Sequence, residues 1–183
     1  MPGSREGRLA LLTPLRRPLL APAVLLALVA AALPAAAAGR GLSMGLPTAR
    51  IARVEDQIVG CTNRARTARG LPALRRSSVL RHAAKYHAHN MLRYNFFRHD
   101  DVFGQSPADR VARFGRRGVF RWVGENIAVG YWSARDVCHA WMASHEHRAN
   151  ILSRHFTMIG VGYARAGDGR TYFVQDFGSH QAR

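Results

Sequence analysis

The spacing of apolar residues predicts a helix soon after residue 48. Between residues 51 and 68 these residues recur at steps of three and four, which places them on one face of a helix. Gly70 and Pro72 then end this helix. The residues on its inward face are Ile51, Val54, Ile58, Cys61, Ala65 and Ala68.

Capping residues predict two further helices. Ser77 or Ser78 can cap a helix whose inward stripe ends at Met91. Ser106 is followed by proline at the first helical position and by Asp109 three residues on, which is the pattern of a capping box. A short third helix is therefore expected to begin just after Ser106.

Alternating apolar residues predict strands in the second half of the chain. Residues 122–130 have this pattern, and a helix then leads toward His145-Glu146-His147-Arg148-Ala149-Asn150. Residues 159–163 and 172–175 also alternate, and Gly167-Asp168-Gly169 between them signals a hairpin. Because helices come first and strands gather late, the chain is predicted to be an α+β domain with an antiparallel sheet.

Residues 1–38 have the features of a secretory signal peptide. Arginines precede an apolar run from Leu19 to Leu33, and four alanines then provide a small-residue cleavage pattern. We expect a cleaved signal peptide at 1–38, a linker at 39–48 and a polar tail at 179–183. The protein is therefore expected to be secreted. The stretch from Leu19 to Ala38 is also about long enough to span a bilayer, so an uncleaved membrane anchor is the alternative.

Length and composition limit the class of protein. A chain of 183 residues has room for one domain after the leader, and 48% hydrophobic residues argue against wholesale disorder. The net charge of +16 would attract an anionic envelope component or a lipid, although a compositional bias toward arginine is the alternative that we favour. The sequence has no interleaved aromatic platform, so we expect no specific nucleic-acid partner. We expect a monomer.

Two cysteines, Cys61 and Cys138, remain after the leader. An even number in an exported chain permits one disulfide, and the oxidising compartment favours its formation. Two buried free thiols are the alternative.

Two histidines and a glutamate are candidates for chemistry. His99 and His147 lie in a loop and at a helix end, among aromatic and polar residues, and Glu125 lies at the mouth of a predicted strand. Imidazole and carboxylate groups suit a divalent metal such as zinc, and they also suit acid–base work near neutral pH. These three residues are far apart in the sequence, and their spacing alone does not predict that they lie close together in the fold. His87, on an apolar helical face, is expected to be a core histidine bonded to the backbone.

Two catalytic patterns are incomplete in the segment around His147. His145-Glu146 begins like the helical zinc-protease signature, but Ala149 stands where the second histidine would be. Ser144 and His147 would suit nucleophilic catalysis, but Ser144 lacks the glycines of a nucleophile elbow.

Seven short motifs occur in a fixed order between Asn63 and Tyr163, within the stretch from Ile51 to Gly178. They are Asn63-x-x-Arg66, Gly70-Leu71-Pro72-x-Leu74, Ala84-x-x-His87-Ala88-x-x-Met91, Phe96-Phe97-x-His99, Gly124-Glu125-Asn126-Ile127-Ala128, Trp141-x-x-Ser144-x-x-His147-Arg148-x-Asn150-Ile151-Leu152 and Ile159-Gly160-Val161-Gly162-Tyr163. Together they resemble the bacterial branch of the CAP superfamily, the SCP-like extracellular proteins. This superfamily includes cysteine-rich secretory proteins, venom antigens and plant pathogenesis-related proteins. We place the domain at residues 49–178.

The resemblance implies a three-layer α-β-α sandwich around a central antiparallel sheet, with a cleft of histidines and acidic residues. The matching cleft positions are His99, Glu125, Ser144 and His147, and the expected metal ligands are His99, Glu125 and His147. Ser144 stands where the animal and plant branches have a second glutamate. Glu146 replaces the usual glycine, but neighbouring helical residues point about 100° apart, so it does not automatically supply the missing carboxylate.

The resemblance leaves two functions open. Family members are associated with divalent metal binding, with lipid or sterol binding and with proteolysis. The chain would be either a secreted binding module, whose cleft holds zinc or a small anionic or lipidic ligand, or a metal-assisted hydrolase of peptide or cell-wall material. The missing second carboxylate and the absence of a nucleophile motif favour the binding module, and no catalytic residue is assigned.

Overall fold

The structure, a computed structural model, describes residues 48–116 and 118–180. The predicted signal peptide and nearly all of the predicted linker lie outside the described residues. Thr48, the last residue of that linker, is already helical. Within the described residues, no helix is both long and apolar enough to cross a membrane.

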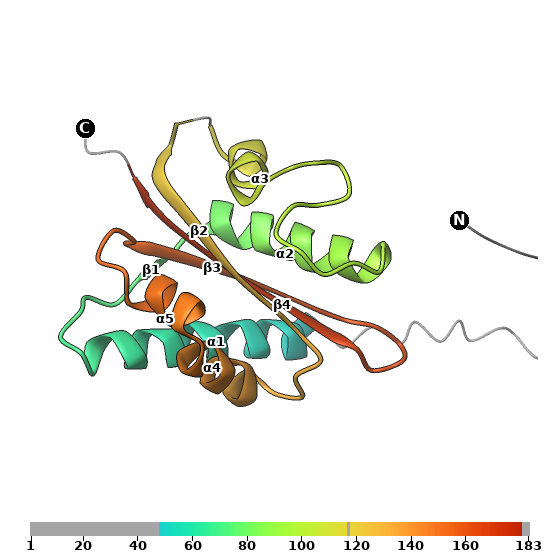
Figure 1. Ribbon diagram of the computed structural model, residues 1–183, viewed down its shortest axis with the longest axis horizontal. Coiled ribbons are helices and arrows are strands. Elements are labelled where there is room, and N and C mark those ends of the chain that lie inside the picture. The colour runs from blue at the N-terminus through green and yellow to red at the C-terminus, as the bar shows by residue number, and fades with distance from the viewer. Residues whose placement is uncertain (1–47, 117, 181–183) are drawn as a thin grey trace, which may run out of the picture. The chain divides into compact units, whose positions relative to one another are not determined.

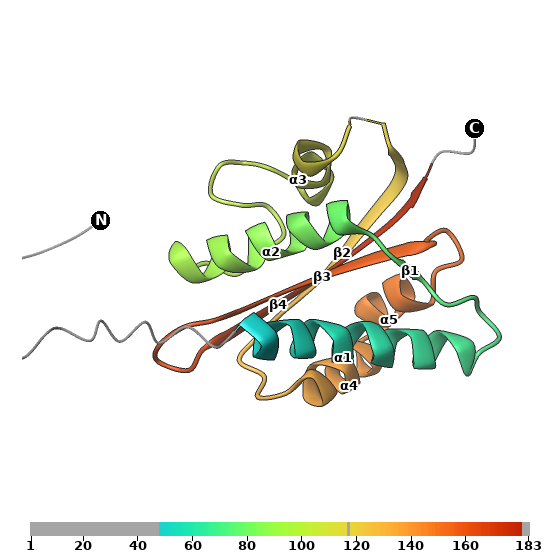
Figure 2. The same cartoon turned by 180° about the vertical axis from the view of Figure 1, so that it is seen from behind.

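The described domain is a sheet between two layers of helices (Figures 1 and 2). Helices α2 and α3 cover one face of the sheet, and α1, α4 and α5 cover the other. This arrangement confirms the predicted α-β-α sandwich. The elements are α1 (Thr48–Thr67), β1 (Arg75–Arg76), α2 (Ser78–Arg93), α3 (Pro107–Phe114), β2 (Phe120–Val129), α4 (Ala134–Ala143), α5 (His145–Leu152), β3 (Met158–Arg165) and β4 (Thr171–His180).

The four strands lie in the order β1-β3-β4-β2. The pairs β3–β4 and β2–β4 are antiparallel as predicted, but β1 pairs with β3 in parallel, so the sheet is mixed. A strand of two residues is too short for alternation to reveal it. The predicted tail at 179–183 was also wrong in part, because β4 continues to His180 and Ser179 is buried opposite Trp122.

The capping predictions are confirmed. The Ser77 hydroxyl accepts from the Leu80 amide at the start of α2, and Ser106 and Asp109 form the capping box of α3. The helix predicted to run toward His145 ends earlier, because Ser144 has extended backbone angles (φ −77°, ψ 133°) and separates α4 from α5. This break places Ser144 at the N-cap of α5.

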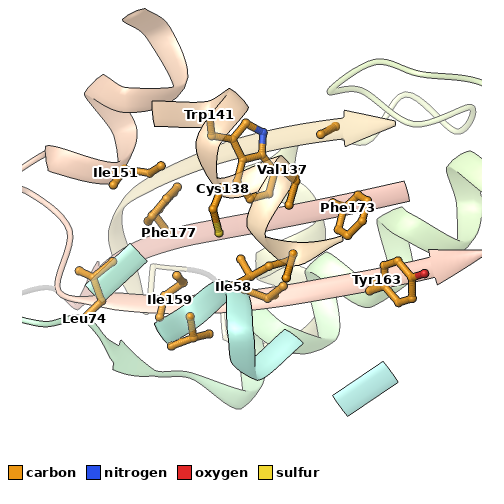
Figure 3. Close-up of a cluster of buried hydrophobic side chains, with 14 of the residues drawn as sticks. Ile58, Leu74, Val137, Cys138, Trp141, Ile151, Ile159, Tyr163, Phe173 and Phe177 are labelled. Carbon is orange, nitrogen blue, oxygen red and sulfur yellow. The ribbon is translucent and has the colours of Figure 1, made fainter. Parts of the chain in front are cut away.

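The main hydrophobic core lies between the sheet and the layer formed by α1, α4 and α5 (Figure 3). Ile58 from α1, Trp141 from α4 and Phe177 from β4 are all buried in it. The Trp141 indole also donates a hydrogen bond of 3.2 Å to the Ile127 carbonyl of β2. The apolar stripe predicted for the first helix therefore faces this core from Ile51 to Ala65. The inclusion of Ala68 was wrong, because α1 ends at Thr67 and Ala68 is exposed.

Two glycines of β3 let α2 pack directly on the opposite face of the sheet. A Cβ atom at Gly160 would lie 2.1 Å from the Arg81 amide nitrogen, and one at Gly162 would lie 2.3 Å from the Ala84 carbonyl group. Any side chain would therefore push α2 away from the sheet. The close approach matters because α2 leads directly into the loop that carries His99.

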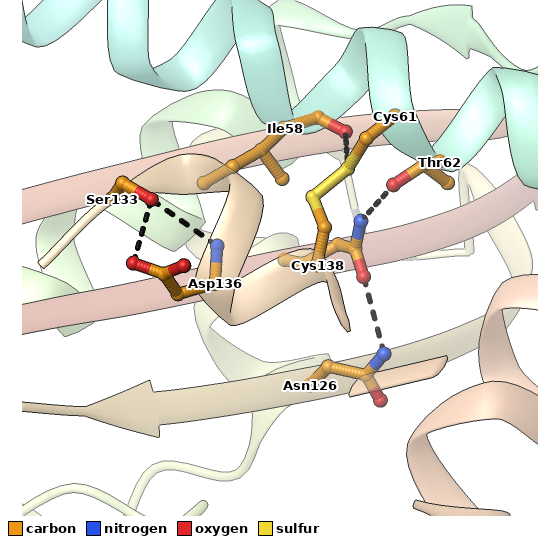
Figure 4. Close-up of a disulfide and its surroundings, with 8 residues drawn as sticks. Ile58, Cys61, Thr62, Asn126, Ser133, Asp136 and Cys138 are labelled. Carbon is orange, nitrogen blue, oxygen red and sulfur yellow. Dashed lines mark hydrogen bonds between the residues drawn. A yellow bond between two sulfur atoms is a disulfide. The ribbon is translucent and has the colours of Figure 1, made fainter. Parts of the chain in front are cut away.

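The disulfide between Cys61 and Cys138 is present, as predicted (Figure 4). It joins α1 to α4 within one helical layer, with a Cα–Cα distance of 6.6 Å. The described residues contain no free cysteine.

Candidate functional site

Glu125 on β2 is the centre of a buried polar cluster. Its Oε2 accepts a hydrogen bond of 2.6 Å from Nη2 of Arg110, and its Oε1 lies 2.8 Å from Nδ1 of His99. Arg110, from α3, is fully buried and also donates to the backbone carbonyls of His99 and Gln105. Arg110 therefore fixes the backbone of the loop that carries His99, and Glu125 fixes the imidazole.

The contact with Glu125 defines the state of His99. An ionised carboxylate only accepts hydrogen bonds, so Nδ1 of His99 carries the hydrogen. This hydrogen bond raises the pKa of His99 above its ordinary value. The side chain is 54% exposed. Its Nε2, which has no described hydrogen-bond partner, is the atom available to a ligand.

Two further titratable groups lie behind Glu125. His87 is fully buried, with Nε2 at 3.0 Å from the Arg98 carbonyl and 3.9 Å from Oε1 of Glu125, so it is the backbone-bonded core histidine that its position predicted. Burial lowers the pKa of His87. Asp176 pairs with Glu125 in the register of β4 and β2, and burial, with the neighbouring negative charge, raises the pKa of Asp176 well above its ordinary value.

His147 lies in the first turn of α5, where its Nδ1 is 2.8 Å from the Ser144 hydroxyl. Burial lowers the pKa of His147, and the positive charge of His99 lowers it further. The pKa of His99 is therefore above its ordinary value and that of His147 is below it, partly because of the charge on His99. Glu146 is exposed on the same helix, so it does not supply a buried second carboxylate.

A chain of buried amides holds α5 against the sheet. The Asn126 amide donates to the His147 carbonyl at 3.1 Å and to Gln175 of β4 at 3.1 Å, and Gln175 donates to Thr62 of α1 at 2.6 Å. Figure 4 shows the part of this chain that runs from Thr62 to Asn126. Asn150 donates to the Asn126 side chain at 2.9 Å. Asn126 thus holds α5, and with it His147, against the strand that carries Glu125.

Sequence reasoning did not single out Arg110, Asn126 or Gln175 as part of the site. Asn126 was visible as the neighbour of Glu125 within a motif, and Arg110 as a charged residue beside the inward-facing Val111. Neither signal identifies the residue that each side chain bonds to, because Arg110 and Glu125 meet only when α3 packs over the sheet.

A pocket of about 330 Å³ lies beside His147. Ser144 and His147 are polar members of its lining, and Phe97 belongs to the loop that also carries His99. Trp132, which follows the pocket residue Tyr131, is 86% exposed. The remaining lining residues are Phe97, Ile127, Ala128, Val129, Tyr131, Ala140 and Trp141.

The cluster does not offer three metal ligands at once. Among the described residues, no group of three or more histidine, cysteine, aspartate or glutamate side chains is arranged to hold a metal ion. Glu125 is engaged through both oxygens, by Arg110 and by His99. Glu125 is therefore suited to orient His99 rather than to bind an ion directly. His99 and His147 are the groups that could contact an ion, each through Nε2.

Two proteins of Bacillus subtilis are similar to this chain in sequence. YkwD, an uncharacterized protein of Bacillus subtilis, is 37% identical over 117 residues, which are 64% of this chain and 45% of YkwD. YlbC, an uncharacterized membrane protein of the same species, is 31% identical over 67% of this chain and 34% of its own length. The chain thus spans less than half the length of either relative.

Two solved structures are similar to this chain in fold. An outer surface protein of Borrelia burgdorferi superposes with a TM-score of 0.67 at 21% identity, over 75% of this chain and 98% of its own. An extracellular protein of Bacillus anthracis that contains an SCP domain superposes with a TM-score of 0.61 at 30% identity, over 72% of this chain and 43% of its own. A sequence model of the cysteine-rich secretory protein family matches residues 59–177, more than half of the chain. The protein therefore belongs to the cysteine-rich secretory protein, or CAP, family.

Proposed function

We propose that this CAP domain is an extracellular binding module whose pocket beside His147 takes a small lipidic ligand with a polar head. Location outside the cytoplasm is supported by the similarity to an extracellular SCP-domain protein of Bacillus anthracis and by the disulfide. The observation that carries the proposal is the pocket itself, whose lining is mostly apolar and includes two polar side chains, Ser144 and His147.

The lining of the pocket indicates the chemistry of the ligand. Ligand pockets are usually apolar, with a few polar groups that fix orientation. Here Phe97, Ile127 and Trp141 would contact an apolar body, and the Ser144–His147 pair would meet the head group. His99, whose pKa is raised, adds positive charge near His147 and favours a head group that is anionic.

Decanoate is a suitable probe for this pocket. We expect saturable binding to the protein by calorimetry, and about tenfold tighter binding than for octanoate, because each buried CH₂ group contributes about 0.8 kcal/mol. Ala140→Phe fills the pocket from α4 and is expected to abolish binding. Ala68→Phe, at an exposed position after α1, is the matched control and should leave the affinity unchanged.

Equal affinity for the two chain lengths would count against an apolar pocket. Decanoate binding that survives Ala140→Phe would mean that the ligand binds elsewhere on the surface. No binding of decanoate by the wild-type protein would refute the proposal.

A divalent ion, zinc in particular, is a second ligand class, at the two histidines His99 and His147. His99 and His147 would hold it through Nε2, and the Glu125 carboxylate would orient His99 from outside the coordination shell. A bound zinc ion would supply Lewis-acid chemistry. Calorimetric titration with zinc is expected to show binding that His147→Ala loses and that Glu146→Gln, an exposed control, retains.

A metal-assisted hydrolase of peptide or cell-wall material is the alternative function. The two histidines would act either as ligands of the ion or, where no ion is bound to them, as an acid–base pair. Their opposite pKa shifts suit the second role, with His147 as the neutral base and His99 as the protonated acid. Turnover of peptide or cell-wall substrates by the wild type, lost in His147→Ala while the fold survives, would establish the hydrolase. A binding module has no turnover to lose.

A further inference from the structure

A second pocket, of about 490 Å³, lies at the other end of α5 from Ser144. The connection from α1 to β1 forms one side of it, and the connection from α5 to β3 forms the other. Figure 2 shows these two connections at the same end of the domain. The two pockets have no lining residue in common.

Arg66 forms the inner wall of this pocket and is 2% exposed. Its guanidinium donates to the carbonyls of Pro72, Ile151 and Ser153 at 2.8–2.9 Å, and to that of Phe156 at 3.4 Å. These acceptors are neutral, so the positive charge has no carboxylate beside it. A guanidinium has five N–H donors, and the four bonds leave one on Nη2. Burial without a counter-charge also lowers the pKa of Arg66.

Two exposed arginines lie at the rim of the pocket, Arg75 on β1 and Arg154 in the α5–β3 connection. Within residues 48–116 and 118–180, neither side chain has an ion-pair partner. The neighbouring Arg76 is different, because Asp56 pairs with it at 2.7 Å. The lining of the pocket contains no acidic residue and includes Thr157, a further donor. Three positive charges thus face one concavity, with no negative charge in its lining to neutralise them.

We propose that this arginine pocket, formed by Arg66, Arg75, Arg154 and Thr157, binds a phosphate group. Guanidinium groups bind phosphate through paired, charge-assisted hydrogen bonds, and a concave wall of one charge concentrates the field that attracts an anion. A tetrahedral phosphate offers enough oxygen atoms to meet several donors at once. Leu71 and Phe156 also line the pocket, so an apolar group attached to the phosphate would have a surface to contact.

Inorganic phosphate is the first probe, titrated into the protein in about 0.1 M salt, where exposed charges are screened beyond about 10 Å, and followed by amide chemical shifts. We expect the shifts to concentrate at residues 71–75 and 154–157 and to leave Ser144 and His147 unchanged. Arg75→Gln combined with Arg154→Gln is expected to weaken binding by about tenfold or more, since each lost charge-assisted bond is a strong one. Both side chains are exposed and carry no described contact, so the fold is expected to survive.

The matched control removes the same charge from another part of the surface. Arg135→Gln with Arg165→Gln changes two exposed arginines outside the pocket and should leave the phosphate affinity within about twofold of wild type, because distant surface charges are screened by salt. An equal loss in both double variants, or shifts spread over all surface arginines, would overturn the site in favour of general attraction by net charge. Absence of binding at millimolar phosphate would overturn it as well.

A second titration identifies the source of the phosphate. Hexyl phosphate that binds at least tenfold tighter than inorganic phosphate, while hexanol does not bind, would indicate a lipid-like phosphate that uses the wall at Leu71 and Phe156. Equal affinity of the two phosphates would indicate free phosphate or a polymer phosphate. Both results support the pocket, and neither depends on the ligand of the His147 pocket, which the decanoate experiment tests with different variants.

Discussion

Both carboxylate oxygens of Glu125 accept from neighbours that carry or can carry positive charge, Arg110 at 2.6 Å and His99 at 2.8 Å. The side chains of Glu125 and Arg110 are buried almost completely. Removal of one partner from a buried ion pair leaves the other charge without compensation. A single residue therefore controls both the stability of α3 on the sheet and the protonation of His99.

Glu125→Gln is expected to lower the free energy of unfolding by about 3 kcal/mol, because Arg110 then stays buried without a full counter-charge. The same change is expected to lower the pKa of His99, because the hydrogen bond to Glu125 is the main cause of its rise. Urea denaturation measures the first effect, and an NMR titration of the His99 ring measures the second. Glu146→Gln, at an exposed position, is the control for the loss of one negative charge.

The sign of the pH dependence follows from the direction of these shifts. The pKa of His99 is raised from 6.5 in the folded state, so its contribution to stability is fully present below pH 6.5 and is lost as pH rises through the folded pKa. His87 and His147, whose pKa values are lowered, act in the opposite sense and reduce stability as pH falls below 6.5. Glu125→Gln should remove the His99 contribution and should lower the pKa of His87 further, because Glu125 raises the pKa of both histidines. An unchanged His99 titration would contradict this account.

Helix α5 depends on its neighbours more than any other element near the site. It has eight residues, no side-chain hydrogen bond at its N-cap, and one buried residue, Ile151. Isolated helices of this length are unstable in water. Its position is set by Asn126 and Asn150 at the sheet, and by Arg66, which donates to the carbonyls of Ile151 and Ser153 at its C-terminal end. Polar contacts therefore place His147.

Asn126→Ala is expected to cost about 2 kcal/mol, because it leaves Gln175 and a backbone carbonyl without their buried partner. Amide hydrogen exchange in α5 should accelerate relative to exchange in α2. Ser106→Ala, which removes the cap of α3 at a cost of about 1 kcal/mol, is the control for a general loss of stability. Equal acceleration of α5 in both variants would show that Asn126 has no particular role there.

At the scale of the whole molecule, one covalent link crosses the layer of helices packed on the main core. Cys61 of α1 and Cys138 of α4 are 77 residues apart in the chain, so the disulfide closes a loop that includes α2, α3 and β2. A long loop restricts the unfolded chain strongly, and the chain-entropy treatment assigns about 4 kcal/mol to a loop of this size.

Cys61→Ser combined with Cys138→Ser is therefore expected to lower the free energy of unfolding by about 4 kcal/mol, measured by urea denaturation. The wild-type protein under reducing conditions should show the same loss. The site should be preserved at temperatures where the variant is folded, because neither cysteine contacts His99, Glu125 or His147 in the described structure. A loss below about 1 kcal/mol would mean that the unfolded chain is not restricted by the link.

Local signals were sufficient for most of the secondary structure. The capping box at Ser106 and the alternation in 159–163 each depend on residues close together in the chain, so sequence reasoning located them. The two-residue strand β1 was missed because only its partner β3 defines it. The continuation of β4 through Ser179 was missed for the same reason, since pairing with Trp122 makes that polar residue part of the sheet.

The sequence by itself determined most of the helices and the antiparallel strands, because periodicity and capping act over a few residues, and it supplied His99, Glu125 and His147 as candidates for chemistry. Only the tertiary structure decided what those residues do together. Glu125 proved to be engaged by Arg110 and His99, and Arg66 proved to lie against four carbonyls in a second pocket. Such contacts join distant segments, and a hydrogen bond forms only when packing brings its donor and acceptor to about 3 Å from one another.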